Sequence, residues 1–108
     1  MARQATTADV FNAVADARRR DILDALRQGG RSVGDLVGAL GLAQPQVSKH
    51  LGVLRAVGAV SLDRRGRHHV YTVNGDALRP IHDWVGAYHE TWTRRLDALD
   101  AVLREEER

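Results

Sequence analysis

The chain has 108 residues and no cysteine, which excludes disulfides, thiolate metal sites and cysteine nucleophiles. No apolar run approaches the roughly 18 residues that a membrane helix needs, and residues 1–7 lack the apolar stretch of a signal peptide. Residues 1–74 carry 11 basic and 6 acidic groups, whereas residues 75–108 carry 5 basic and 8 acidic groups. We therefore expect one cytoplasmic domain over residues 1–108, with a basic body that meets phosphate and no contact with a membrane.

The N-terminal part predicts two helices. Thr6 or Thr7 can cap the first helix, whose apolar residues are Val10, Phe11 and Val14. Asp16 can cap a second helix over residues 17–27, with Ile22, Leu23 and Leu26 on its buried side. Both helices therefore have one apolar face to pack.

The next segment has the layout of a helix-turn-helix. Ser32 followed three residues later by Asp35 approximates a capping box for a third helix over residues 32–40. Gly34 and Gly38 lie inside that helix, where we expect them to allow a close approach by a neighbouring helix. Gly41 ends it, and a fourth helix runs from about residue 44 to residue 57. Two short helices joined by a glycine turn are typical of a motif that places its second helix in a DNA major groove.

The fourth helix has one apolar and one polar face. Val47, Leu51 and Leu54 follow a helical period and predict its buried stripe. The other side presents amides, a hydroxyl and cations, which can hydrogen-bond base edges and grip phosphates. We expect this DNA-binding set to be Gln44, Gln46, Ser48, Lys49, His50 and Arg55. The alternative is an ordinary solvated helix face.

A β-hairpin with a basic tip follows the fourth helix. A two-residue loop at Arg65–Gly66 would pair Arg64 with Arg67, and alternation would put Val60, Leu62, Tyr71 and Val73 on one face. Like charges side by side destabilise an isolated hairpin, so a phosphate backbone is their expected partner. The predicted DNA-binding residues of this wing are Arg64, Arg65, Arg67 and His68, and a merely soluble turn is the alternative.

The last segment predicts one long helix over residues 76–106 for dimerisation. Its apolar residues recur at alternating spacings of three and four, which is coiled-coil-like. One small domain can hardly cover so long a stripe, so we expect a second copy to bury it in a two-fold dimer, the alternative being an intramolecular core. The stripe consists of Leu78, Ile81, Val85, Tyr88, Trp92, Leu96, Leu99 and Leu103, with Trp84 beside it.

Three segments resemble the ArsR-type family of bacterial winged-helix repressors: residues 14–23 (VADARRRDIL), 44–54 (QPQVSKHLGVL) and 65–71 (RGRHHVY). The resemblance implies a mainly helical winged helix-turn-helix with about five helices and a two-stranded wing. It also implies a homodimer through the first and last helices, with the fourth helix in the major groove of a pseudo-palindromic operator. The expected function is therefore that of a dimeric, sequence-specific repressor with double-stranded DNA and a second copy as partners.

The chain departs from the family pattern at a few positions. Ala17 stands where the family often has proline, and Ala43 where it often has a capping serine or threonine. Without that cap the first turn of the fourth helix is weakened by about 1 kcal/mol. The third helix lacks the paired cysteines of the thiolate sensors, so we expect no soft-metal sensing.

The last helix offers His82, Asp83, His89 and Glu90 as potential metal ligands. Their order matches neither the Asp-x-His nor the His-x-x-Glu spacing of zinc-sensing relatives, so we expect no metal and no cofactor. A metal-responsive repressor that uses these ligands is one alternative. A winged helix used only for dimerisation or protein contacts is another.

Enzymatic activity is not expected. Ser48 and His50 lie two apart on a helix and face different directions, so they do not form a nucleophile and its base. The glycines follow no strand and precede no Gly-Lys-Ser/Thr motif, so they do not form a phosphate loop. No pattern identifies an effector.

Overall fold

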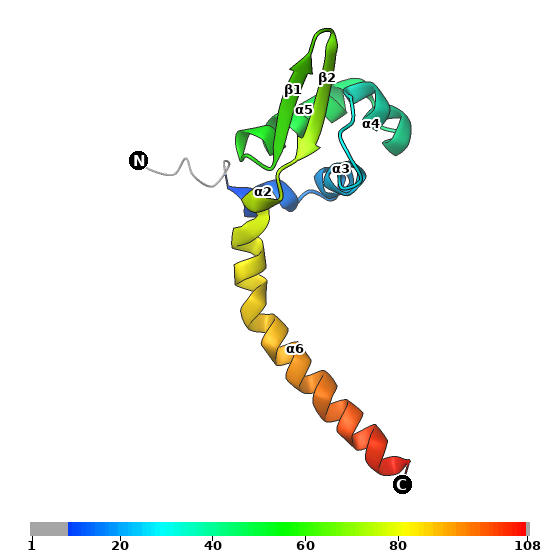
Figure 1. Ribbon diagram of the computed structural model, residues 1–108, viewed down its shortest axis with the longest axis vertical. Helices are drawn as coiled ribbons and strands as arrows, with labels where there is room; N and C mark the ends of the chain where they lie inside the picture. The colour runs from blue at the N-terminus through cyan, green and yellow to red at the C-terminus, as the bar shows by residue number, and fades with distance from the viewer. Residues whose placement is uncertain (1–8, 108) are drawn as a thin grey trace, which may run out of the picture. The chain divides into compact units, whose positions relative to one another are not determined.

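The computed structural model describes residues 9–107, and the chain divides into two compact units, Met1–Leu78 and Arg79–Arg108. The described part is mainly helical with one antiparallel hairpin, as predicted (Figure 1). None of its helices is both long enough and apolar enough to cross a membrane. The elements in chain order are α2 (Val10–Val14), α3 (Ala17–Leu26), α4 (Val33–Leu40), α5 (Gln44–Ala56), β1 (Val60–Arg65), β2 (His68–Val73), the 3-10 helix η1 (Gly75–Leu78) and α6 (Arg79–Glu106).

Short polar side chains cap α2, α3 and α4. Asp9 caps α2 by accepting a hydrogen bond from the Asn12 backbone N–H at 2.7 Å, whereas Thr6 and Thr7 lie outside the described residues. Asp16 caps α3 as predicted. The predicted capping box of α4 is confirmed, because the Asp35 N–H donates to Ser32 Oγ at 3.1 Å and the Ser32 N–H donates to Asp35 Oδ2 at 3.3 Å. These caps satisfy backbone donors that have no partner within the helix.

The core of the first unit fixes α5 against α3 and α4. Val47, Leu51 and Leu54 are each at most 1% exposed, which confirms the predicted buried stripe. Each such burial stabilises the fold by about 1.5–3 kcal/mol. The turn before α5 is closed by Gly41, whose φ of 67° is the left-handed conformation that favours glycine. The core consists of Ala13, Ile22, Leu23, Leu26, Leu36, Val47, Leu51, Leu54, Ala59 and Val60.

The register of the hairpin differs from the prediction. Arg65 lies opposite His68, so the two-residue loop is Gly66–Arg67 rather than Arg65–Gly66. Arg64 is paired with His69, and the predicted pair of Arg64 with Arg67 is wrong. Gly66 has a φ of 60° and no non-glycine residue of the described part has a positive φ, which fits a type II′ turn with glycine in its first central position.

The shift is by two residues, so it changes the partners without changing the faces. Val60 lies opposite Val73 and Leu62 opposite Tyr71. These four residues share one face of the hairpin, as predicted, because side chains alternate with a period of two.

A backbone bridge joins the hairpin to the segment before α4. The N–H of Arg31 donates to the Tyr71 carbonyl at 3.0 Å, and the N–H of Tyr71 donates to the Arg31 carbonyl at 2.8 Å. The preceding residue, Gly30, lies so close to β2 that an added Cβ would clash with Val70 Cγ1 and come within 3.1 Å of Thr72 Cγ2. Gly34 and Gly38 in α4 do not have this role, since within residues 9–107 no atom of another helix lies within 4 Å of a Cβ added at either. Their predicted role in close helix approach is wrong.

The second unit is the single helix α6. It begins at Arg79 instead of the predicted residue 76, because Gly75–Leu78 form the 3-10 turn η1. Most of its apolar stripe is exposed in the single chain: Trp84 59%, Tyr88 52%, Trp92 52%, Leu96 65%, Leu99 55% and Leu103 50%. A helix with an apolar face of this length needs a partner to cover it.

Candidate nucleic-acid interface

The outer face of α5 is the first part of the candidate site. Val47, Leu51 and Leu54 are buried in the core on one side of the helix. The predicted residues on its other side are therefore held at the surface. Gln44, Gln46, Ser48, Lys49 and Arg55 are all exposed.

Both amides on this face already have a hydrogen-bond partner. Gln44 Nε2 donates to Ser48 Oγ at 3.2 Å, one helical turn away. Gln46 Oε1 accepts from the Ala43 backbone N–H at 3.3 Å. A capping box needs two reciprocal hydrogen bonds, and the methyl group of Ala43 cannot accept one of them. The bond from the Ala43 N–H to Gln46 is therefore half of a capping box.

His50 is placed differently from the other predicted residues of α5. It lies three residues after Val47 and four before Leu54, so it stands at the margin of the buried stripe and is half-buried. Its Nδ1 is 3.5 Å from Nη1 of Arg19 in α3. The sequence predicted that His50 lies on the open face of α5. In the structure it contacts α3 instead.

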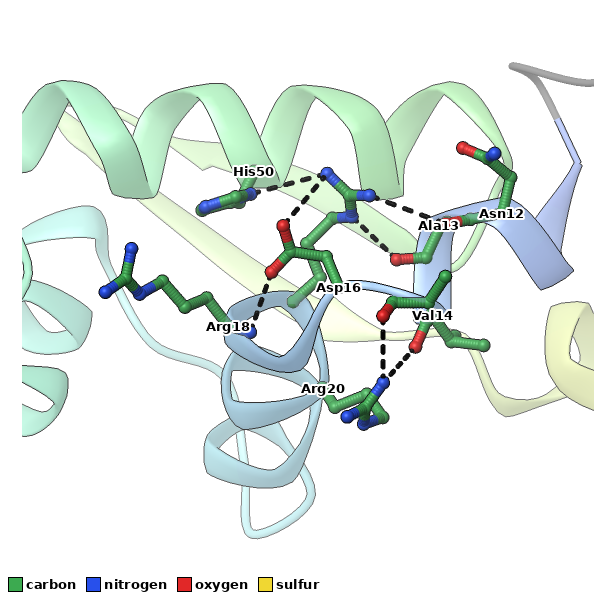
Figure 2. A network of polar contacts seen from close by, with 9 residues as sticks. Asn12, Ala13, Val14, Asp16, Arg18, Arg20 and His50 are labelled. Atoms are coloured by element: carbon green, nitrogen blue, oxygen red, sulfur yellow. Dashed lines mark hydrogen bonds and ion pairs between the residues drawn. The ribbon is translucent and has the colours of Figure 1, made fainter.

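The contact of His50 belongs to a polar network that joins α2, α3 and α5 (Figure 2). Arg19 Nε donates to the Ala13 carbonyl at 2.6 Å, and Asp16 Oδ2 lies 4.0 Å from Arg19 Nη1. The backbone N–H of Arg18 donates to Asp16 Oδ1 at 2.8 Å and lowers the pKa of that carboxyl from its ordinary value of 3.8. The sequence shows only a run of arginines here and gives no sign that one of them reaches α5.

Arg20 supplements this network on the other side of α2. Its Nη1 donates to the Val14 carbonyl at 2.7 Å and to the Ala15 carbonyl at 3.2 Å. Two successive arginines thus satisfy the carbonyls at the end of a helix that is only five residues long.

The wing is the second part of the candidate site. Arg64, Arg65, Arg67 and His68 are all exposed, and they lie at or next to the loop of the hairpin. Arg65 Nε donates to Asp63 Oδ2 at 2.7 Å, an exposed pair that contributes little to stability. With a single carboxylate beside three guanidiniums, the tip of the wing is positively charged.

The predicted dimer residues of the first helix are placed unequally. Val10 is 8% exposed and Val14 packs against the core, so both are largely covered within one chain. Phe11 is 43% exposed. Of the three, only Phe11 therefore retains a large exposed area for a second copy.

The histidines and carboxylates of α6 do not assemble into a site in the single chain. No three His, Asp or Glu side chains of residues 9–107 come together in a way that could hold a metal ion. His82 Nδ1 lies 3.4 Å from Asp83 Oδ1. Glu90 Oε1 lies 3.9 Å from Nη2 of Arg94, which is one helical turn further along.

Comparison with known proteins agrees with this geometry. A family model described as "Bacterial regulatory protein, arsR family" matches residues 16–61, which include α3, α4 and α5. The transcriptional repressor SdpR of Bacillus subtilis (strain 168) is 32% identical over 77 residues, covering 71% of this chain and 86% of SdpR.

Solved structures give the same assignment. An ArsR-like transcriptional regulator from Rhodococcus sp. RHA1 has 30% sequence identity and a TM-score of 0.68, and the match covers 92% of this chain and 93% of that one. The homodimeric winged helix-turn-helix DNA-binding domain Mb0332 from Mycobacterium bovis, a possible ArsR-family regulator, has 31% identity and a TM-score of 0.62, with 75% of each chain covered. With its fold, its helix-turn-helix and these relatives in agreement, the chain belongs to the arsR family of bacterial regulatory proteins.

Proposed function

We propose that this protein is a dimeric transcriptional repressor that binds a pseudo-palindromic operator in the bacterial cytoplasm. The observation that carries the proposal is the outer face of α5, where Gln44, Gln46, Ser48 and Lys49 stand exposed on a helix anchored by a fully buried stripe. A rigid helix with amides and a hydroxyl near its N-terminus suits direct readout in a major groove. The family supports the same function, since SdpR is a transcriptional repressor.

The internal hydrogen bonds of α5 determine what each amide can offer to DNA. Gln46 uses its oxygen for the Ala43 N–H, so its NH₂ group is left for a base acceptor. Gln44 uses its nitrogen for Ser48, so its oxygen is left for a base donor. A bidentate contact to adenine uses both atoms of one amide, and each glutamine still has the capacity for it, because an amide oxygen has two lone pairs and an amide nitrogen has two N–H groups.

The wing supplies contacts that do not depend on sequence. Arg64, Arg65 and Arg67 can bind phosphate oxygens or enter the minor groove beside the site that α5 reads. Each phosphate contact releases counterions and therefore adds to the salt dependence of binding. The wing thus contributes affinity, and α5 contributes selectivity.

The apolar stripe of α6 supports the dimer. Two-fold symmetry would place two copies of α5 about 34–36 Å apart, or a multiple of one helical turn, on one side of the DNA. In the homodimeric relative Mb0332 the same winged domain is paired. The interface residues that we propose are Val10, Phe11 and Val14 of α2 and, in α6, Ile81, Trp84, Val85, Tyr88, Trp92, Leu96, Leu99 and Leu103.

The test measures affinity for the DNA upstream of the protein's own gene and for a scrambled duplex over a salt series. We expect tighter binding to the upstream DNA and a steep linear loss of affinity with the logarithm of salt concentration. Gln46→Ala should cost about 1–3 kcal/mol on the operator and little on the scrambled duplex. A wild-type protein with equal, salt-independent affinity for both duplexes would refute the proposal.

A further inference from the structure

The guanidinium of Arg19 is held in one orientation by its surroundings. Its Nε donates to the Ala13 carbonyl at 2.6 Å, and its Nη2 donates to the Asn12 carbonyl at 3.5 Å. Asp16 Oδ2 lies 4.0 Å from Nη1, and the arginine side chain is only 15% exposed. Because the group is planar and fixed at these points by α2 and α3, the direction of its remaining N–H groups is fixed as well.

One of these N–H groups faces the imidazole of His50. Nη1 of Arg19 lies 3.5 Å from His50 Nδ1 (Figure 2). A guanidinium can only donate hydrogen bonds, so in this contact Nδ1 is the acceptor. The contact favours the tautomer of the neutral ring whose proton sits on Nε2, on the side of the ring away from Arg19.

The place of His50 on α5 selects its partner. The residue stands at the margin of the helix, three positions after buried Val47, while Gln46, Ser48 and Lys49 occupy the open face. A helix in the major groove presents its open face to base edges and its flanks to the two phosphate backbones. An N–H donor at the margin is therefore placed for a phosphate oxygen.

We propose that Arg19 is a positioning residue that fixes His50 as a neutral Nε2–H donor to a DNA phosphate. His50 then does not read a base, and Arg19 acts on DNA binding without touching DNA. This inference rests on the proposed function, because it takes DNA as the partner. It also makes α2 part of the DNA-binding machinery, since the Asn12 and Ala13 carbonyls orient the arginine.

The first test needs no DNA. Long-range ¹H–¹⁵N spectra distinguish the two neutral tautomers of a histidine, and they are recorded on the DNA-free protein at about pH 8, above the ordinary histidine pKa of about 6.5. We expect His50 to show the Nε2–H form in the wild type and to lose this preference in Arg19→Lys, which keeps the charge but has no planar fork. A proton on Nδ1 of His50 in the wild type would overturn the proposal.

The second test replaces His50 with each of two amides. The amide nitrogen of glutamine stands near the place of Nε2, whereas that of asparagine stands near the place of Nδ1. His50→Gln should therefore lose less affinity than His50→Asn and His50→Ala, each of which should lose roughly tenfold, as one hydrogen bond to a charged group is worth. The loss should be equal on the operator and on a scrambled duplex, because a phosphate carries no sequence information.

The outcomes separate this proposal from the proposed function. If His50→Asn binds DNA more tightly than His50→Gln, or if affinity is lost only on the operator, the role given to His50 is wrong. The proposed DNA-binding function would not be affected by either result. A wild-type protein that binds no duplex overturns the phosphate contact together with the proposed function.

A double-mutant cycle then tests the positioning role of Arg19. Arg19→Lys should weaken DNA binding in the wild-type background but not in His50→Gln, since an amide nitrogen needs no tautomer to be selected. Equal losses in both backgrounds would show that Arg19 acts through the fold alone and overturn its positioning role. Thermal unfolding of each variant confirms that the compared proteins are folded.

Discussion

Two glycines of the first unit should respond to the same substitution with opposite signs. Gly30 lies against β2, where an added Cβ would meet the side chains of Val70 and Thr72 and come within 3.3 Å of the Tyr71 carbonyl. Gly38 lies inside α4, where no neighbouring atom of the described residues lies within 4 Å of an added Cβ. We predict that Gly30→Ala destabilises the protein and that Gly38→Ala stabilises it.

The expected magnitudes follow from these two environments. Glycine in a helix interior costs about 0.5–1 kcal/mol relative to alanine, so Gly38→Ala should raise the unfolding temperature by roughly 2–8 °C. Overpacking costs about 1–3 kcal/mol, so Gly30→Ala should lower that temperature by at least about 4 °C. Gly30 also adjoins the Arg31–Tyr71 backbone bridge, so relief of the clash would displace the wing.

Thermal unfolding followed by circular dichroism measures both changes, with all proteins at one concentration because dimerisation adds to apparent stability. Binding to a scrambled duplex then reports on the wing, and we expect Gly30→Ala to weaken it while Gly38→Ala leaves it unchanged. A Gly30→Ala protein as stable as the wild type would show that β2 can move away without cost. A destabilised Gly38→Ala would show that α4 has a neighbour at this face.

Further outcomes are expected at other sites. Leu96→Asp should shift the protein from dimer to monomer in sedimentation, because it places a charge in the apolar stripe of α6, and a monomeric wild type at micromolar concentration would contradict this. Arg67→Ala should lower affinity for all duplexes and flatten the salt slope by about one unit per contact, whereas Arg104→Ala on α6 serves as a control of equal charge loss. The pKa of Asp16 is lowered, so its contribution to stability is present above pH 3.8 and is lost as the pH falls through its folded pKa. Asp16→Asn should remove this part of the acid sensitivity when the free energy of unfolding is measured against pH. Zinc or cadmium should not release the protein from DNA, and a tenfold loss of operator affinity on titration would refute that expectation.

Much of the fold could be predicted because the decisive signals are local. The Ser32–Asp35 capping box, the Asp16 cap and the glycine turn at Gly41 each depend on a few neighbouring residues. The buried stripe of α5 follows from helical periodicity alone. These features define the helix-turn-helix, so the sequence was sufficient to place the outer face of α5.

The features that escaped prediction depend on contacts between distant residues or on a choice between near-equal turns. The alternation of β1 and β2 is the same for registers that differ by two residues, so only the position of Gly66 in the turn decides the pairing. The close approach of β2 to Gly30 could not be predicted, because nothing in the sequence shows which strand packs on this residue. Likewise, the spacing of α5 predicted that His50 lies with the DNA-binding residues on the open face of the helix. It did not show that Arg19, 31 residues earlier, contacts the histidine ring.

The hydrogen bond between the Ala43 N–H and Gln46 gives one side chain a second role. In the free protein, the Gln46 oxygen closes the N-terminus of α5. That oxygen has a second lone pair, so the same amide can contact a base while it closes the helix. One side chain can therefore serve both order and selectivity at this end of α5. Ala43→Ser would separate the two roles, because a serine hydroxyl could cap the helix while the glutamine stays with the base.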